Sequence, residues 1–152
     1  MQHKIIETED VVIRFAGDSG DGMQLTGTLF ADASALYGNE ISTFPDYPAE
    51  IRAPQGTVSG VSGFQVHIGS VKINTPGDFC DVLVAMNPAA LKANVKWAKP
   101  TATIIVDADT FDEKGIQRAG YATQDPIAEL NIQDRNLILA PITTLTKESL
   151  KD

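Results

Sequence analysis

Short runs of apolar residues alternate along this chain with stretches whose apolar positions follow a helical period. The pattern predicts strands at 11–16, 41–44, 81–86, 102–106 and 136–142, helices at 21–37, 88–98 and 126–130, and an amphipathic tail at 144–152. Continuous apolar runs such as DVLVAM at 81–86 are typical of parallel strands buried on both faces. Strands that alternate with helices predict a three-layer, Rossmann-like α/β domain with a mostly parallel sheet.

One region departs from this parallel pattern. Residues 57–70 alternate, with Phe64 and Val66 on one side and Gln65 and His67 on the other. This alternation predicts a long half-buried strand, and Gly69-Ser70 is expected to turn it into a short partner strand at 71–73. We therefore expect an antiparallel excursion, which makes the sheet mixed.

The sequence GDSGDG at 17–22 contains three glycines within six residues, between a predicted strand and a predicted helix. A tight turn of this kind leaves unbonded backbone N–H groups at the helix N-terminus, just beyond the end of the strand. The first expectation for this loop is therefore an anionic ligand.

Known motifs match the loop only in part. Gly17, Gly20 and Gly22 are spaced G-x-x-G-x-G, whereas the dinucleotide fingerprint is G-x-G-x-x-G. Met23 stands where the P-loop of nucleoside triphosphatases has a lysine. The G-D-G motif of thiamine diphosphate enzymes needs an asparagine pair further along the chain. At the corresponding positions, 48–52, this chain has no asparagine.

A structural explanation of the loop also has to be considered. Asp18, Ser19 or Asp21 could cap the helix, and the glycines could let the helix pack on the strand. In addition, the two carboxylates would repel a phosphate at close range. A phosphate held here therefore needs positive charge from elsewhere in the protein.

Composition narrows the class of protein. A chain of 152 residues with 43% hydrophobic and 21% charged residues suits one globular domain. The net charge of −8 argues against a nucleic-acid partner. No apolar run approaches the ~20 residues of a membrane span, and no apolar signal core opens the chain, so we expect a cytoplasmic protein. The single cysteine, Cys80, excludes an internal disulfide or cysteine-ligated cluster, and no catalytic or metal-ligating set stands out.

Four motifs occur in an order that resembles a known family. They are GDSGDG at 17–22, YPAEIRAPQG at 47–56, FQVHI at 64–68 and DVLVAMNP at 81–88. Together they resemble the γ subunit, or γ domain, of 2-oxoacid:acceptor (ferredoxin) oxidoreductases over nearly the whole chain. The likeness is greatest to 2-oxoglutarate-type members, in which the γ domain is fused ahead of the α domain. Ser19, Asp21 and Ala53-Pro54 depart from the general γ pattern.

The resemblance implies that residues 1–152 are a coenzyme A-binding γ domain, of the pyruvate/ketoisovalerate oxidoreductase catalytic type, and a fragment of a longer chain. It implies an enzyme component, inactive without α and β partners, that helps to bind coenzyme A and covers the active site. The complex would oxidatively decarboxylate a 2-oxoacid and reduce ferredoxin. Thiamine diphosphate, Mg and iron–sulfur clusters would lie in partner domains. The implied coenzyme A-binding residues are Gly17, Ser19, Gly20, Asp21, Gly22, Met23, Gln24 and Arg52.

Two sets of basic residues have alternative interpretations. Arg52 could grip a phosphate or carboxylate bidentately, or it could pair with Glu50 or Asp46. On the helix predicted at 88–98, Leu91, Val95 and Ala98 share one face. Lys92, Lys96 and Lys99 lie on another side, where they could meet the coenzyme's 3′-phosphate or form a solvated face. The alternative for the whole chain is a non-catalytic interaction or nucleotide-binding module whose glycine loop is structural.

Overall fold

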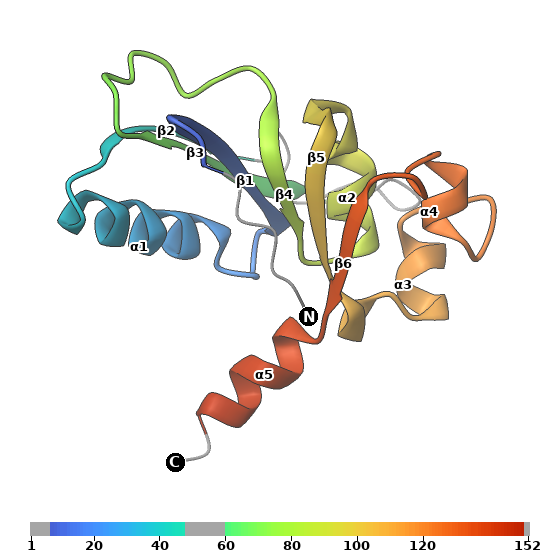
Figure 1. Cartoon of the computed structure of the whole chain (residues 1–152). Helices are drawn as coiled ribbons and strands as arrows, with labels where there is room; N and C mark the ends of the chain where they lie inside the picture. The colour runs from blue at the N-terminus through green and yellow to red at the C-terminus, as the bar shows by residue number, and fades with distance from the viewer. Residues whose placement is uncertain (1–6, 48–59, 151–152) are drawn as a thin grey trace, which may run out of the picture.

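The computed structural model describes residues 7–47 and 60–150, and its centre is a six-stranded sheet (Figure 1). The strand order is β2-β3-β1-β4-β5-β6. The strands are β1 (Asp10–Asp18), β2 (Glu40–Asp46), β3 (Val61–Gly69), β4 (Cys80–Ala85), β5 (Ala98–Asp107) and β6 (Asn136–Ala140). Only β3 runs against its neighbours, since it pairs antiparallel with both β1 and β2, while β1, β4, β5 and β6 pair in parallel. The expected mixed, mostly parallel sheet with an antiparallel excursion is confirmed.

Helices cover both faces of this sheet (Figure 1). The helices are α1 (Met23–Leu36), α2 (Pro88–Asn94), α3 (Glu113–Arg118), α4 (Pro126–Glu129) and α5 (Ile142–Ser149), with short 3₁₀ turns η1 (Val95–Trp97) and η2 (Ala108–Thr110). None of the helices in the described ranges is long and apolar enough to cross a membrane.

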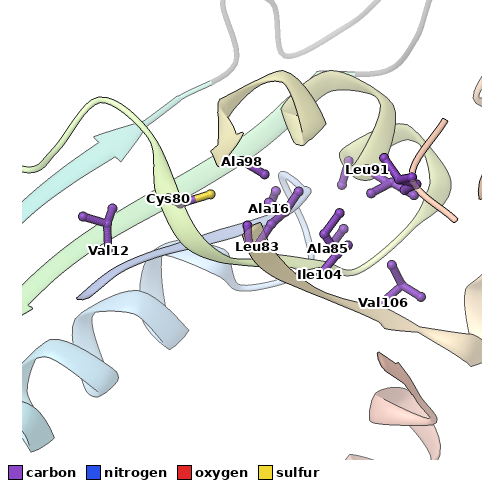
Figure 2. Close-up of a cluster of buried hydrophobic side chains, with 12 residues drawn as sticks. Val12, Ala16, Cys80, Leu83, Ala85, Leu91, Ala98, Ile104 and Val106 are labelled. Atoms are coloured by element: carbon purple, nitrogen blue, oxygen red, sulfur yellow. The ribbon is translucent and has the colours of Figure 1, made fainter. Parts of the chain in front are cut away.

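Two apolar clusters separate the layers. One is formed by α1 and the sheet, with Met23 and Ala31 packed against Phe15, Phe64 and Val66. The other lies on the opposite face and joins α2 to β1, β4 and β5; Figure 2 shows its members, among them Ala16, Leu83, Ala85, Leu91 and Ile104. The helix that follows β1 and the helix that follows β4 therefore lie on opposite faces of the sheet.

The helix predicted at 88–98 is shorter in the structure. It begins as expected, with Asn87 as N-cap and Pro88 in the first turn, but α2 ends at Asn94. Ala98 is the first residue of β5, so its expected place on a helix face is wrong. Pro100 has no backbone N–H and disfavours a helical conformation in the residue before it, so the chain extends early.

The three lysines of this region consequently do not form one helix face. Lys92 donates to the Gly120 carbonyl and lies over the Tyr121 ring at 4.5 Å. Lys99 lies on β5 and pairs with Asp81 at 2.7 Å. These contacts indicate structural roles for both side chains.

The chain around β3 corrects a second expectation. Residues 71–73 form no strand; they belong to a loop whose carbonyls at Pro76 and Gly77 accept from Gln65. The strand is also more buried than expected, because Gln65 is only 3% exposed. Its polar side meets this loop and the buried Arg14 instead of water.

Candidate functional site at the carboxyl ends of β1 and β4

The glycine loop lies at a point where the sheet changes its winding direction. Neighbouring parallel strands β1 and β4 are followed by helices on opposite faces, α1 and α2. In α/β sheets, this arrangement leaves a crevice beyond the carboxyl ends of the two strands, and ligands bind there. Residues 19–22 and Asn87 occupy that position.

The loop is a tight turn closed by one of its own carboxylates. The Asp21 N–H donates to the Asp18 carbonyl at 3.0 Å, and the Asp18 N–H donates to Asp21 Oδ2 at 2.7 Å. Gly22 then adopts a left-handed conformation, with φ of 72°, and α1 begins at Met23. Two hydrogen bonds and one left-handed residue therefore hold the turn.

The N-terminus of α1 has no side-chain cap. Gly22 is its N-cap residue, and its first turn contains no acidic residue. The first bond within the helix is from Thr26 N–H to the Gly22 carbonyl, so the N–H groups of Met23, Gln24 and Leu25 have no acceptor within it. The explanation of the loop as a side-chain cap is therefore wrong, because Asp21 bonds to the strand end instead. The N–H groups carry the partial positive charge of the helix end.

The structure explains two of the three glycines of the loop, each for a different reason. A Cβ on Gly17 would lie 2.7 Å from Asp21 Oδ2, so the turn itself requires a glycine there. Gly22 is required by its left-handed backbone. Gly20 is different: a Cβ there would meet nothing within 4 Å, and its φ is not positive. Within the described structure, no contact explains why residue 20 has no side chain.

The two other predicted site residues on α1 point their side chains toward the sheet. Met23 is 3% exposed and packs in the cluster under α1. Gln24 donates through Nε2 to the Gly63 carbonyl at 2.8 Å and to Ser62 Oγ at 3.1 Å. The polar group that each residue can offer to a ligand beyond the loop is therefore its backbone N–H. Ser19 and Gly20 are exposed.

A polar cavity of about 360 Å³ lies beside the loop on the α2 side. Its lining includes Asp18 and Asn87 together with Lys114 and Arg118, which are exposed and four residues apart on α3. Neither cation forms an ion pair with any residue in the described ranges. They can supply the positive charge that a bound phosphate requires. Sequence reasoning missed them because α3, with six residues, is too short to show a helical period.

The carboxylates that line this cavity already have hydrogen-bond donors. Asp112 accepts from Gly115 N–H and Asp109 accepts from Thr144 N–H, each at 2.7 Å. Asp18 accepts from the Asn87 amide at 3.0 Å. Burial raises the pKa of the Asp18 carboxyl, the Asn87 hydrogen bond lowers it, and the charge of Asp21 raises it.

A second cavity, of about 540 Å³, lies on the α1 side of the loop. Apolar side chains, including Phe15, Met23 and Met86, line it together with hydroxyls and Lys147 of α5. The loop therefore separates a polar cavity from a mostly apolar one. This arrangement suits a ligand with both anionic and apolar parts.

The buried reactive groups of the chain are placed for packing. Cys80 is fully buried, and burial raises the pKa of its thiol to about 11. Burial also raises the pKa of Tyr121, whose hydroxyl donates to the Pro88 carbonyl at 2.9 Å. In residues 7–47 and 60–150, no group of three or more His, Cys, Asp or Glu side chains is placed to hold a metal ion.

Arg52, the remaining predicted site residue, lies outside the described residues. One of its candidate partners, Asp46, forms an ion pair with Arg14. Arg14 is 6% exposed and also donates to Asn94 Oδ1 at 2.7 Å and to Gln65 Oε1 at 3.3 Å. Sequence reasoning did not single out Arg14, because an arginine in a strand of apolar residues has no local signal of burial.

The mixed sheet with helices on both faces defines a Rossmann-like α/β domain. The crevice beside its glycine loop lies where such domains bind ligands. A sequence model of the family described as pyruvate ferredoxin/flavodoxin oxidoreductase matches residues 12–152. The chain belongs to this family, as the resemblance in its motifs predicted.

Curated relatives agree with this assignment. The chain is 52% identical over 138 residues to the 2-oxoglutarate oxidoreductase subunit KorA of Mycobacterium tuberculosis, covering 91% of this chain and 21% of KorA. It is 32% identical over 140 residues to the 2-oxoglutarate synthase subunit KorC of Methanothermobacter marburgensis, covering 91% of this chain and 67% of KorC. The chain thus spans about a fifth of KorA and two thirds of KorC.

Solved structures share the fold. A 2-oxoglutarate:ferredoxin oxidoreductase from Magnetococcus marinus, with 2-oxoglutarate, coenzyme A and succinyl-CoA bound, matches with a TM-score of 0.69 and 29% identity, over 93% of this chain and 22% of that chain. The γ subunit of a keto/oxoacid ferredoxin oxidoreductase from Geobacter sulfurreducens matches with a TM-score of 0.54 and 24% identity, over 68% of this chain and 53% of that chain. The second likeness concerns the fold alone.

Proposed function

We propose that this chain is the γ domain of a 2-oxoglutarate:ferredoxin oxidoreductase, in which it binds part of coenzyme A and covers the active site. The complex would oxidatively decarboxylate 2-oxoglutarate, transfer the acyl group to coenzyme A and reduce ferredoxin. The similarity to KorA supports the substrate, and the coenzyme A in the Magnetococcus marinus structure supports the ligand. We further propose that residues 1–152 are part of a longer cytoplasmic chain that continues into an α domain and assembles with a β subunit.

The other cofactors are assigned to partners on the basis of the family resemblance. Thiamine diphosphate with Mg would supply the decarboxylation chemistry, and iron–sulfur clusters would carry electrons to ferredoxin. We place both in partner domains and give this chain no catalytic residue. Its own residues would bind the coenzyme, orient it and exclude water from the reacting groups.

One observation carries the proposal: among the residues that the structure describes, nothing contacts the position of a Cβ on Gly20, which lies beside a helix N-terminus whose N-cap residue offers no side-chain cap. A glycine without such a reason is expected where a ligand approaches the backbone closely. Coenzyme A has anionic phosphates, which match the N–H groups at the start of α1 and the cations of the polar cavity. Its pantetheine arm is uncharged, with two amides between apolar segments, and it matches the cavity on the α1 side, where hydroxyls lie among apolar side chains.

The variant Gly20→Ala tests this assignment in the assembled oxidoreductase, expressed from the natural gene with its partner subunits. Because the added methyl group meets no atom of the described residues within 4 Å, stability should change by no more than about 0.5 kcal/mol. The KM for coenzyme A should rise about tenfold, which is a loss of about 1.4 kcal/mol of binding. The KM for 2-oxoglutarate should not change.

Gly22→Ala provides the matched comparison. An alanine in the left-handed conformation costs about 1–2 kcal/mol, so this variant should lose stability whether or not a ligand binds. If Gly20→Ala is stable and its KM for coenzyme A equals that of the wild type, the loop does not bind the coenzyme. If Gly20→Ala instead prevents assembly with the partner subunits, the loop serves partner contact, as in the alternative of an interaction module.

A further inference from the structure

Asn87 connects the glycine loop to the start of α2. Its Nδ2 donates to Asp18 Oδ1 at 3.0 Å and lies 3.4 Å from Asp21 Oδ2. Its Oδ1 accepts from Ala90 N–H at 2.8 Å and so caps α2. One amide therefore joins both carboxylates of the loop to the next strand–helix connection.

The orientation of this amide is determined by its surroundings. Because Oδ1 must face the Ala90 N–H to cap the helix, Nδ2 must face the loop. The position of the residue is also fixed, since the Met86 N–H donates to the Ala16 carbonyl at 2.9 Å and continues the β1–β4 pairing up to Asn87. Asn87 is thus a rigid donor placed at the crevice.

The loop needs such a donor. Asp18 and Asp21 are like charges in one turn, and Asp21 closes the turn by accepting from the Asp18 N–H. Without a donor between them, the two carboxylates repel one another and destabilise this closed turn. A charge-assisted hydrogen bond to each carboxylate opposes that repulsion.

We propose that Asn87 is a positioning residue for coenzyme A. Its amide holds the Asp18 and Asp21 carboxylates next to the start of α2, so that the glycine loop keeps the one conformation that binds the coenzyme. This proposal rests on the proposed function, because it concerns the same loop. Asn87 itself acts through the loop and takes no part in the chemistry.

The variant Asn87→Ser separates this role from helix capping. Serine caps helices about as well as asparagine, but it lacks the amide that bridges the two carboxylates. In the assembled oxidoreductase, the KM for coenzyme A should rise about tenfold, while the KM for 2-oxoglutarate stays the same. Amide hydrogen exchange at Asp18 and Asp21 should be about tenfold faster, since their N–H groups lie in the turn that opens.

Asp125→Ser is the matched control. Asp125 caps α4 and precedes Pro126, as Asn87 precedes Pro88. Its hydrogen bonds to described residues, however, all join it to its own helix and to Thr123. This variant should change neither KM nor exchange in the loop. Asn87→Asp, which also caps, adds a third carboxylate and should raise the KM for coenzyme A more than Asn87→Ser does.

The outcomes distinguish the two proposals. If the wild type depends on coenzyme A but Asn87→Ser leaves its KM and the exchange of the loop unchanged, the positioning role is wrong and the binding site stands. If exchange accelerates while the KM for coenzyme A stays constant, Asn87 is structural only and the positioning role is again wrong. If a stable Gly20→Ala variant leaves the KM for coenzyme A unchanged, the proposed function of the loop fails, whatever the Asn87 variants show.

Discussion

Gly27 lies where α1 packs against β3, and we expect Gly27→Ala to destabilise the protein although alanine is the better helix former. A Cβ at this position would lie 2.1 Å from Phe64 Cδ1, 2.4 Å from Cγ and 2.8 Å from Cβ. Ordinary carbon contacts are about 3.5–4.0 Å. The helix or the ring would therefore have to move by more than about 1 Å, in a cluster where Phe64 is 7% exposed.

The magnitude follows from two opposing effects. Replacing glycine by alanine inside a helix contributes about 1 kcal/mol of stability. Overpacking a well-packed core costs about 1–3 kcal/mol, and a distance of 2.1 Å places this contact at the upper end. The net loss should be about 2 kcal/mol, which lowers the melting temperature of a domain of this size by about 6 °C.

Urea unfolding followed by far-UV circular dichroism measures this change. Thr28→Ala is the matched control, because Thr28 is exposed on the same helix and should change stability by less than about 0.5 kcal/mol. In a Phe64→Ala background the ring is absent, so the cost of Gly27→Ala should fall by at least about 1 kcal/mol. A Gly27→Ala protein as stable as the wild type, or an equal cost in both backgrounds, would refute the reasoning.

Two further predictions concern ionisable groups. Because Cys80 is fully buried and burial raises its pKa to about 11, a thiol reagent should label it only as fast as the protein unfolds; rapid labelling of the native protein would contradict this burial. Burial raises the pKa of Asp18 above 3.8, so the native state holds that proton more tightly than the unfolded chain does. Ionisation therefore costs stability as the pH rises through the native pKa. The free energy of unfolding of Asp18→Asn, relative to that of the wild type, should therefore increase as the pH rises from acid to neutral. If this difference between variant and wild type is the same at every pH, Asp18 has an ordinary pKa in the native protein.

Local patterns predicted most of the fold. The apolar runs located β1, β4 and β5, and the dipeptides Asn87-Pro88 and Asp125-Pro126 located two helix starts. The prediction failed where the local apolar pattern was too short to recognise, or where a proline ended a helix that this pattern extended. The helix α3 has only six residues, and Pro100 ended the helical pattern earlier than its apolar spacing indicated.

The site could be predicted only in part. The sequence placed the glycine loop between a strand and a helix, which is enough to predict N–H groups at a strand end. The sequence could not show which of the three glycines the turn requires. Gly17 is required by a close contact with Asp21 and Gly22 by its left-handed backbone, and neither can be read from the sequence. Nor could it find Lys114 and Arg118, since α3 was not predicted.

The sequence by itself located the strands β1, β4 and β5, the starts of α2 and α4 and the glycine loop, because each depends on residues close together in the chain. It also identified the family, because four such local motifs occur in the family's order. Only the tertiary structure decided which groups meet at the loop. Asn87 and Asp18 are separated by 69 positions in the sequence, and Gln24 and Gly63 by 39. Such contacts depend on which strands become neighbours in the sheet. Strand pairing is set by burial over the whole domain, which no local window of sequence contains.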